Sequence, residues 1–209
     1  MNDLSLLETR VLGTLVEKQH TVPDTYPLTL NSLVSGCNQK TSRSPVMEAA
    51  ETEVQATLDG LKRRNLVIES SGSRVARYAH NVDSVLKIPS QSVAILTALM
   101  LRGPQTPGEL RINCERLHRF ADLSAVEAFL QELAARPAGA LVVQLARLPG
   151  ARENRWAHLL SGTPAADAIP REKDTRDDGA GKNGMEARVA RLESEVAELR
   201  AALDKLRLQ

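Results

Sequence analysis

The sequence has few of the residues on which base stacking, disulfide formation and metal binding depend. Its 209 residues include only five aromatic side chains and two cysteines. Five aromatics are too few for a base-stacking platform, which argues against binding of single-stranded nucleic acid. Two cysteines do not make a disulfide framework, and a zinc site needs more ligands at closer spacing. We therefore expect Cys37 and Cys114 to be core thiols.

Long apolar runs and catalytic motifs are also missing. The longest apolar run, around residues 93–101, is far shorter than the ~18 residues that a membrane span needs. The N-terminal residues lack the basic and apolar regions of a signal peptide. There is no glycine-rich phosphate loop, and the four histidines show neither the spacing of a helical metal pair nor a nucleophile partner. We expect a cytoplasmic, non-enzymatic protein without metal or cofactor.

What the sequence does contain is one pattern that occurs twice. Residues 6–80 and 90–160 each hold three short amphipathic segments followed by two β-like runs around a turn. The third segments align at an offset of 72 residues, matching Val54, Leu58 and Leu61 with Val126, Leu130 and Leu133. The first segments align at an offset of 84, so the first copy is twelve residues longer between its first and third helices. Three helices closed by a hairpin describe a winged helix, so the repeat predicts two in tandem.

Local signals place the helix starts and the hairpins. Thr106, followed by Pro107 and Glu109, predicts a capping box at the start of a helix. Ser124 and Glu127 predict the same device for the third helix of the second copy. After each third helix, residues 66–79 and 141–160 read as strand, turn and strand, the two wings.

These patterns predict a mainly α-helical protein with small β-hairpin wings (α+β). We expect winged-helix domains at residues 1–85 and 86–160, a flexible linker at 161–184 and a coiled-coil helix at 185–209. Heptad spacing favours a parallel two-stranded coil, and hence a homodimer, through Val189, Leu192, Val196, Leu199, Leu203 and Leu206. The alternative is a single amphipathic helix that folds back on the body.

Four segments resemble the YceH family of bacterial proteins: residues 25–31 (TYPLTLN), 37–46 (CNQKTSRSPV), 101–111 (LRGPQTPGELR) and 149–159 (PGARENRWAHL). The resemblance covers about residues 4–160. It implies tandem winged helices, often followed by a coiled C-terminal segment, and no established biochemical role. One residue departs from the family pattern: Ser44 stands where an acidic residue is expected, so the resemblance provides no carboxylate neighbour for Arg43.

Charge argues against a tight grip on DNA. Residues 1–85 carry a net charge of −1, residues 86–160 carry +3 and the remainder carries −1. A domain that holds duplex DNA usually has a clearly basic face. The third helix of the first copy begins with Glu51 and Glu53, at the end that would enter the major groove. Carboxylates there would be repelled by phosphate.

Positive side chains nevertheless gather on the wings and in the extra segment at residues 38–46. The polar residues of that segment suit phosphate or base edges, but they suit internal anchoring or another ligand equally well. Candidate nucleic-acid contacts are Lys40, Arg43, Arg74, Arg77, Arg111, Arg152 and Arg155. Further arginines lie close by in the sequence, namely Arg116, Arg119 and Arg147. The basic run at residues 62–64 reads more simply as a solvated helix end.

Two hypotheses follow. Fold analogy favours a transcriptional regulator that binds duplex DNA as a dimer. The alternative is a protein–protein interaction module, in which the winged helices dock a protein partner and no DNA is bound. A steep salt dependence is expected only of the first.

Overall fold

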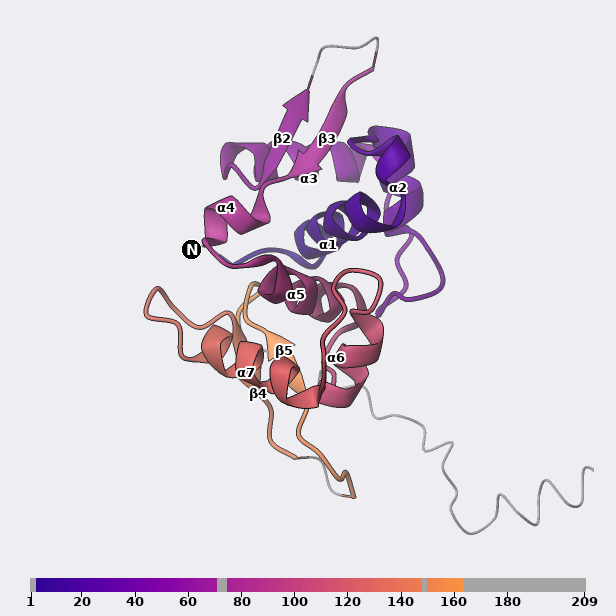
Figure 1. The fold of residues 1–209 in the computed structure, drawn as a ribbon. Coiled ribbons are helices and arrows are strands. Elements are labelled where there is room, and N and C mark those ends of the chain that lie inside the picture. Colours follow the sequence, from indigo (N-terminus) through magenta and orange to yellow (C-terminus); the bar gives the residue numbers. More distant parts are fainter. Residues whose placement is uncertain (1–2, 71–74, 148–149, 164–209) are drawn as a thin grey trace, which may run out of the picture. The chain divides into compact units, whose positions relative to one another are not determined.

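Helices and short antiparallel strands alternate along the chain in a mixed α and β architecture (Figure 1). The computed structural model describes residues 3–70, 75–147 and 150–163. The first half comprises α1 (Leu6–Thr21), a 3₁₀ turn (Pro23–Thr25), β1 (Leu28–Thr29), α2 (Leu30–Cys37), α3 (Glu51–Arg63), β2 (Val67–Ser70), β3 (Arg77–His80) and α4 (Val82–Leu86). The second half comprises α5 (Ser90–Arg102), α6 (Pro107–Asn113), α7 (Leu123–Ala134), β4 (Val142–Gln144) and β5 (Trp156–His158).

Each half carries one small antiparallel sheet. In the first half the strand order is β1-β3-β2, with Leu28 of β1 opposite Tyr78 and Ile68 of β2 opposite Ala79. In the second half β4 pairs with β5, with Val143 opposite Ala157. Both predicted hairpins are therefore present, with strands shorter than the sequence suggested. Strand β1 was not predicted, because two residues are too short for an alternating pattern to be visible.

The helix starts follow capping chemistry, with one correction. Thr106 and Glu109 form the predicted box: the Thr106 amide donates to Glu109 Oε2 at 2.8 Å, and the Glu109 amide donates to Thr106 Oγ1 at 3.3 Å. The box predicted at Ser124 is wrong. The cap lies two residues earlier, at Asp122, whose carboxylate accepts from the Ala125 amide at 2.9 Å, and helix α7 begins at Leu123. The Ser124 hydroxyl donates to the same carboxylate at 2.8 Å, which removes it as a cap.

Helices α1 and α5 are buried on all sides over part of their length. Residues 9–16 of α1 and 92–101 of α5 are buried without interruption, a pattern found in helices that are covered all round. The two helices pack against each other and so cover one another's second face (Figure 1). They approach closely at Gly13, where an added Cβ would lie 2.9 Å from the Leu101 side chain.

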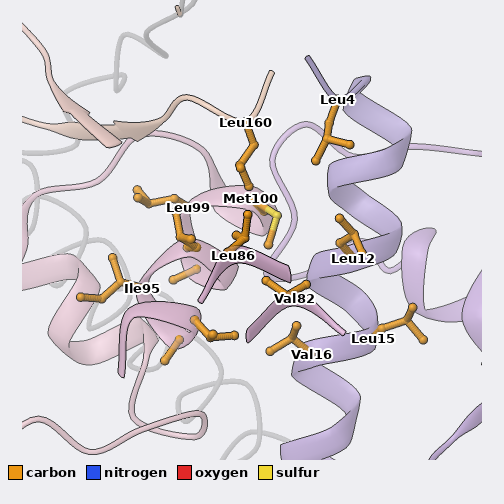
Figure 2. Packing of buried hydrophobic residues seen from close by; sticks show 14 of the residues in the cluster. Leu4, Leu12, Leu15, Val16, Val82, Leu86, Ile95, Leu99, Met100 and Leu160 are labelled. Atoms are coloured by element: carbon orange, nitrogen blue, oxygen red, sulfur yellow. The ribbon is translucent and has the colours of Figure 1, made fainter. Parts of the chain in front are cut away.

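The hydrophobic core between these helices contains residues from both halves of the chain. Figure 2 shows Leu12 and Val16 of α1 pointing toward Val82, Leu86 and Met100. At the edge of the cluster, the Leu4 amide donates to the Leu160 carbonyl at 2.7 Å. Residues Met1–Ala166 accordingly form one compact unit. The division into domains at residue 85 stays a prediction.

Both cysteines are core residues, as predicted, and so is Trp156. Cys37 and Cys114 are fully buried, and Trp156 is 4% exposed. Burial raises the pKa of both thiols, that of Cys114 to about 12, so neither is a thiolate at neutral pH. Within the described ranges no helix is both long and apolar enough to cross a bilayer. The predicted coiled-coil helix and nearly all of the predicted linker lie outside the described residues.

Candidate interaction surface

The extra segment of the first half is closed by its own side chains. Asn38 follows α2, and its side-chain amide donates to the Ala49 carbonyl at 2.9 Å. Its Oδ1 accepts from the Ala49 amide at 2.8 Å. This pair of bonds joins the end of α2 to the residues just before α3. Asn38 therefore anchors the segment internally, which is one of the roles predicted for its polar residues.

Arg43 lies inside this segment and is 6% exposed. Its guanidinium donates to both carboxylate oxygens of Glu17, at 3.1 and 2.6 Å, and to the Gly36 carbonyl at 3.2 and 3.1 Å. Gln39 Oε1 and the Ser42 carbonyl accept two further bonds, at 2.9 and 3.0 Å. A guanidinium has five N–H donors, and these six contacts use them all. Arg43 therefore holds the segment in place and has no donor left for phosphate.

Glu17 supplies the carboxylate that the family pattern places elsewhere. It projects from α1, 26 residues away from Arg43 in the sequence. Burial is the largest single influence on the pKa of Glu17 and acts to raise it, but the hydrogen bonds and charges of Arg43 and Lys18 together outweigh burial, so the net shift is downward. The carboxylate is thus ionised at neutral pH. Ser44 in place of an acidic residue leaves Arg43 with a carboxylate partner after all.

A second arginine, Arg10 of α1, also bonds at both ends of this segment. It is fully buried, and it donates to the carbonyls of Cys37 at 3.0 Å and Pro45 at 2.5 Å. Burial, followed by the nearby Arg43 charge, lowers its pKa. Its Nε has no partner among the described atoms. Sequence reasoning did not single out Arg10, because it reads as a polar residue on the outer face of an amphipathic helix.

The segment also contacts the second half of the chain. The Ser44 amide donates to the Leu101 carbonyl at 2.8 Å, and Arg102 donates to Ser42 Oγ at 2.9 Å. The Leu101 carbonyl and the Arg102 side chain both lie at the C-terminal end of α5. The segment thus links α2 and α3 to α5, which is a structural role.

Two further predicted contacts, Arg77 and Arg155, also bond within the chain. Arg77 lies on β3 and donates to the carbonyls of Thr25 and Pro27, at 3.2 and 2.8 Å. Arg155 forms a bidentate ion pair with Glu109, at 2.8 and 3.0 Å, and donates to the Pro104 carbonyl at 2.9 Å. Bidentate pairs of this kind fix both side chains. Arg155 therefore ties the second wing to the start of α6.

The other predicted cations are exposed or lie outside the described residues. Lys40, Arg111 and Arg152 are exposed on three separate segments. Arg74 falls in residues 71–74, which the structure does not describe. Among the described members of the predicted set, no hydrogen bond or ion pair joins one to another. The sequence-predicted contacts thus divide into an anchored group and an exposed group.

The exposed sides of the third helices are poor in available cations. Lys62 of α3 bonds to Asp59 at 2.8 Å and to Glu69 at 2.5 Å, and it lies 6.0 Å from the centre of the Tyr78 ring. Its bonds to Asp59 and Glu69 raise its pKa. Arg64 pairs with Glu8 at 3.3 Å. Helix α7 contains no lysine or arginine at all, and its Glu127 and Glu132 are exposed.

Titratable clusters of the kind that bind metals are not found in the described part of the chain. The histidines there differ in environment instead. His158 on β5 is largely buried, its Nδ1 has no partner, and burial lowers its pKa to about 4. Burial also lowers the pKa of His80, which bonds to Gln19. Both rings are therefore neutral at pH 7 and act as structural residues.

Comparison with known proteins identifies the family. Residues 4–151 match the family described as "Protein of unknown function, DUF480". A UPF0502 protein of Dechloromonas aromatica is 62% identical over 200 residues, covering 96% of this chain and 94% of its own length. The chain belongs to this family. A UPF0502 protein of Burkholderia vietnamiensis is 57% identical, covering 99% of this chain and 89% of its own length.

The family match agrees with the resemblance found in the sequence. It spans the helices of both halves, the segment at residues 38–46 and strand β4, and it ends before β5. The similarity to these relatives extends over almost the whole chain. Their names state no ligand, partner or reaction.

Proposed function

We propose that the chain is a non-enzymatic module of two tandem winged helices that docks a protein partner. The observation that carries the proposal is the distribution of cations. The third helix of each half, which reads bases in winged-helix DNA complexes, presents mainly paired or acidic side chains: in α3 only Arg63, in the last turn, is an exposed cation, and α7 has no cation. A contact surface of mixed charge is typical of protein partners.

The winged-helix interpretation rests on the order of elements in each half. Helices α1, α2 and α3 precede the β2–β3 hairpin, and helices α5, α6 and α7 precede the β4–β5 hairpin. In the first half, β1 adds a third strand between the first two helices, a further feature of winged helices. Packing of α1 against α5 and the bonds from residues 38–46 would hold the two units in a fixed relation.

Electrostatics favours a protein partner over duplex DNA. DNA binding by a small domain relies on several lysine or arginine contacts to phosphate. Of the predicted contacts, Arg43, Arg77 and Arg155 are committed to carbonyl or carboxylate acceptors within the chain. Moving them to phosphate would cost these internal bonds. Helix α7 would add two exposed carboxylates to the interface.

Duplex DNA remains a second candidate because of the exposed arginines of the second half. Arg111, Arg147 and Arg152 are all exposed. Arginines after the second helix and on the wing could contact phosphate without a base-reading helix. Such binding would be weak, independent of sequence and strongly salt-dependent.

We further propose that the heptad segment at residues 185–209 makes the module a homodimer. Its valines and leucines follow the two-stranded pattern. Sedimentation equilibrium of the full chain should give twice the monomer mass, and a chain ending at residue 184 should give the monomer mass. If the full chain also sediments as a monomer, the result would support the alternative in which the segment folds back on the body.

Site-specific photocrosslinking tests which class of partner is bound. A benzophenone amino acid at exposed Ala128 of α7, or at exposed Arg152 of the second wing, would be irradiated in living cells. A protein partner gives adducts that survive nuclease and disappear with protease. Adducts that collapse to the monomer band on nuclease treatment would overturn the proposal in favour of DNA.

A further inference from the structure

Helix α6 and the turn after it have one buried side and one outward side. Leu110 and Cys114 are fully buried, and the Cys114 thiol lies 3.5 Å from the Ala94 carbonyl. A single turn follows α6, closed by the His118 amide, which donates to the Cys114 carbonyl at 2.8 Å. With about 3.6 residues per turn, Ile112 projects from α6 on the side opposite to Leu110.

Ile112 is 72% exposed, more than any other large apolar side chain of the described residues. A single exposed apolar residue is ordinary on a protein surface. Its surroundings set Ile112 apart, because three exposed arginines flank it in the sequence: Arg111, Arg116 and Arg119. We call Arg111, Ile112, Arg116 and Arg119 the α6 outer face.

The α6 outer face carries a net positive charge. Glu115 is the one exposed carboxylate between Ile112 and Arg119. Asp122, which caps α7 through the Ala125 amide, also interacts with the charge of Arg111. Glu109, at the start of α6, is paired with Arg155. Three arginines therefore face two carboxylates, Glu115 and Asp122.

We propose that the α6 outer face docks an acidic segment of the partner protein, with an apolar side chain of that segment covering Ile112. The inference rests on the proposed function and names the chemistry of the partner. Arginine forms bidentate bonds to carboxylates and is enriched in protein interfaces. An apolar side chain surrounded by arginines matches a segment in which glutamate or aspartate alternates with leucine-like residues.

Duplex DNA fits this face less well. The phosphate backbone would pair with the arginines, but Ile112 would be covered by a polar, hydrated surface and gain little. Glu115 would be repelled along the same path. For an acidic peptide, Glu115 lies at the edge of the contact, where side chains remain solvated and contribute little.

Selection from a phage library of short random peptides against the full-length protein tests the inference. The expected winners carry several carboxylates and at least two large apolar side chains. Each should bind Ile112→Ser and Arg116→Glu about tenfold or more weakly than the wild-type chain, which corresponds to about 1.4 kcal/mol. Both side chains are exposed, so circular dichroism of the variants should match that of the wild type.

Matched controls come from the first half, where Lys40 and Val46 are also an exposed cation and an exposed apolar residue. Lys40→Glu and Val46→Ser should leave peptide binding unchanged. A selection that yields no binders, or basic ones, or binders indifferent to Ile112→Ser, would overturn the inference and leave the protein-docking function standing. Mixed-sequence duplex DNA that binds the wild type, tolerates Ile112→Ser and is lost with Arg116→Glu would overturn both.

Discussion

Replacing Arg43 with alanine should destabilise the fold strongly, even though sequence reasoning placed this arginine at a nucleic-acid interface. The substitution removes the bidentate pair with Glu17 and the bonds to Gly36 and Gln39. It also leaves the Glu17 carboxylate, whose side chain is 18% exposed, without its main partner. Breaking a buried pair by removing one member costs about 3–5 kcal/mol, because an uncompensated charge remains.

Urea unfolding at pH 7, followed by circular dichroism, measures this cost. Lys40→Ala is the matched control, since Lys40 is an exposed cation of the same segment and should change the free energy of unfolding by less than about 0.5 kcal/mol. In a Glu17→Gln background, Arg43→Ala should cost less than in the wild type by about 1–3 kcal/mol, because the pair is already broken. An Arg43→Ala protein as stable as the wild type would refute the anchoring role and would mean that Arg43 is exposed to solvent.

The remaining predictions concern local packing and pH. Gly36→Ala should destabilise the fold by about 1–3 kcal/mol, since the new Cβ would lie 2.6 Å from Thr14 Cγ2; a neutral effect in urea unfolding would mean that α1 and α2 can separate. Gly60→Ala, in α3, should stabilise by about 0.5–1 kcal/mol, because the new methyl meets nothing closer than 3.8 Å; a loss of stability would contradict the packing there. The pKa of His158 is about 4 in the folded chain against 6.5 ordinarily. The neutral ring therefore contributes fully to the free energy of unfolding above pH 6.5. This contribution, about 3 kcal/mol in total, is lost as the pH falls through about 4. His158→Leu should flatten unfolding free energy between these pH values relative to the wild type, whereas the exposed His20→Leu control should not; equal slopes for all three proteins would count against the buried ring.

Local signals in the sequence were sufficient for much of the fold. The Thr106 box, the two β-hairpins and the positions of the third helices depend on residues close together in the chain, and the structure contains each of them. The error at Ser124 is also local, because Asp122 and Ser124 are both good caps and the carboxylate is the stronger acceptor.

Distant contacts explain what the sequence did not reveal. The polar residues Thr9, Arg10 and Thr14 of α1 suggest a solvated face, but all three are buried. Thr14 contacts Cys37 of α2, and Arg10 donates to the Cys37 and Pro45 carbonyls. The partners of the predicted site residues are equally remote: Glu17 lies 26 residues from Arg43, and Glu109 lies 46 residues from Arg155. Periodicity carries no information about such pairs, so anchored and exposed arginines look alike in the sequence.

Fluorescence anisotropy of mixed-sequence duplex DNA with the full-length protein tests the central claim most directly. Titrations at ~50 and ~200 mM salt show whether any binding is electrostatic. Each neutralised phosphate contributes about −0.9 to the slope of log affinity against log salt, so electrostatic binding weakens steeply at the higher salt. A protein-docking module predicts no saturable binding at ~50 mM salt with tens of micromolar protein. Micromolar or tighter binding that collapses at the higher salt, and is lost with Arg111→Glu and Arg152→Glu, would contradict the account and establish the DNA interface instead.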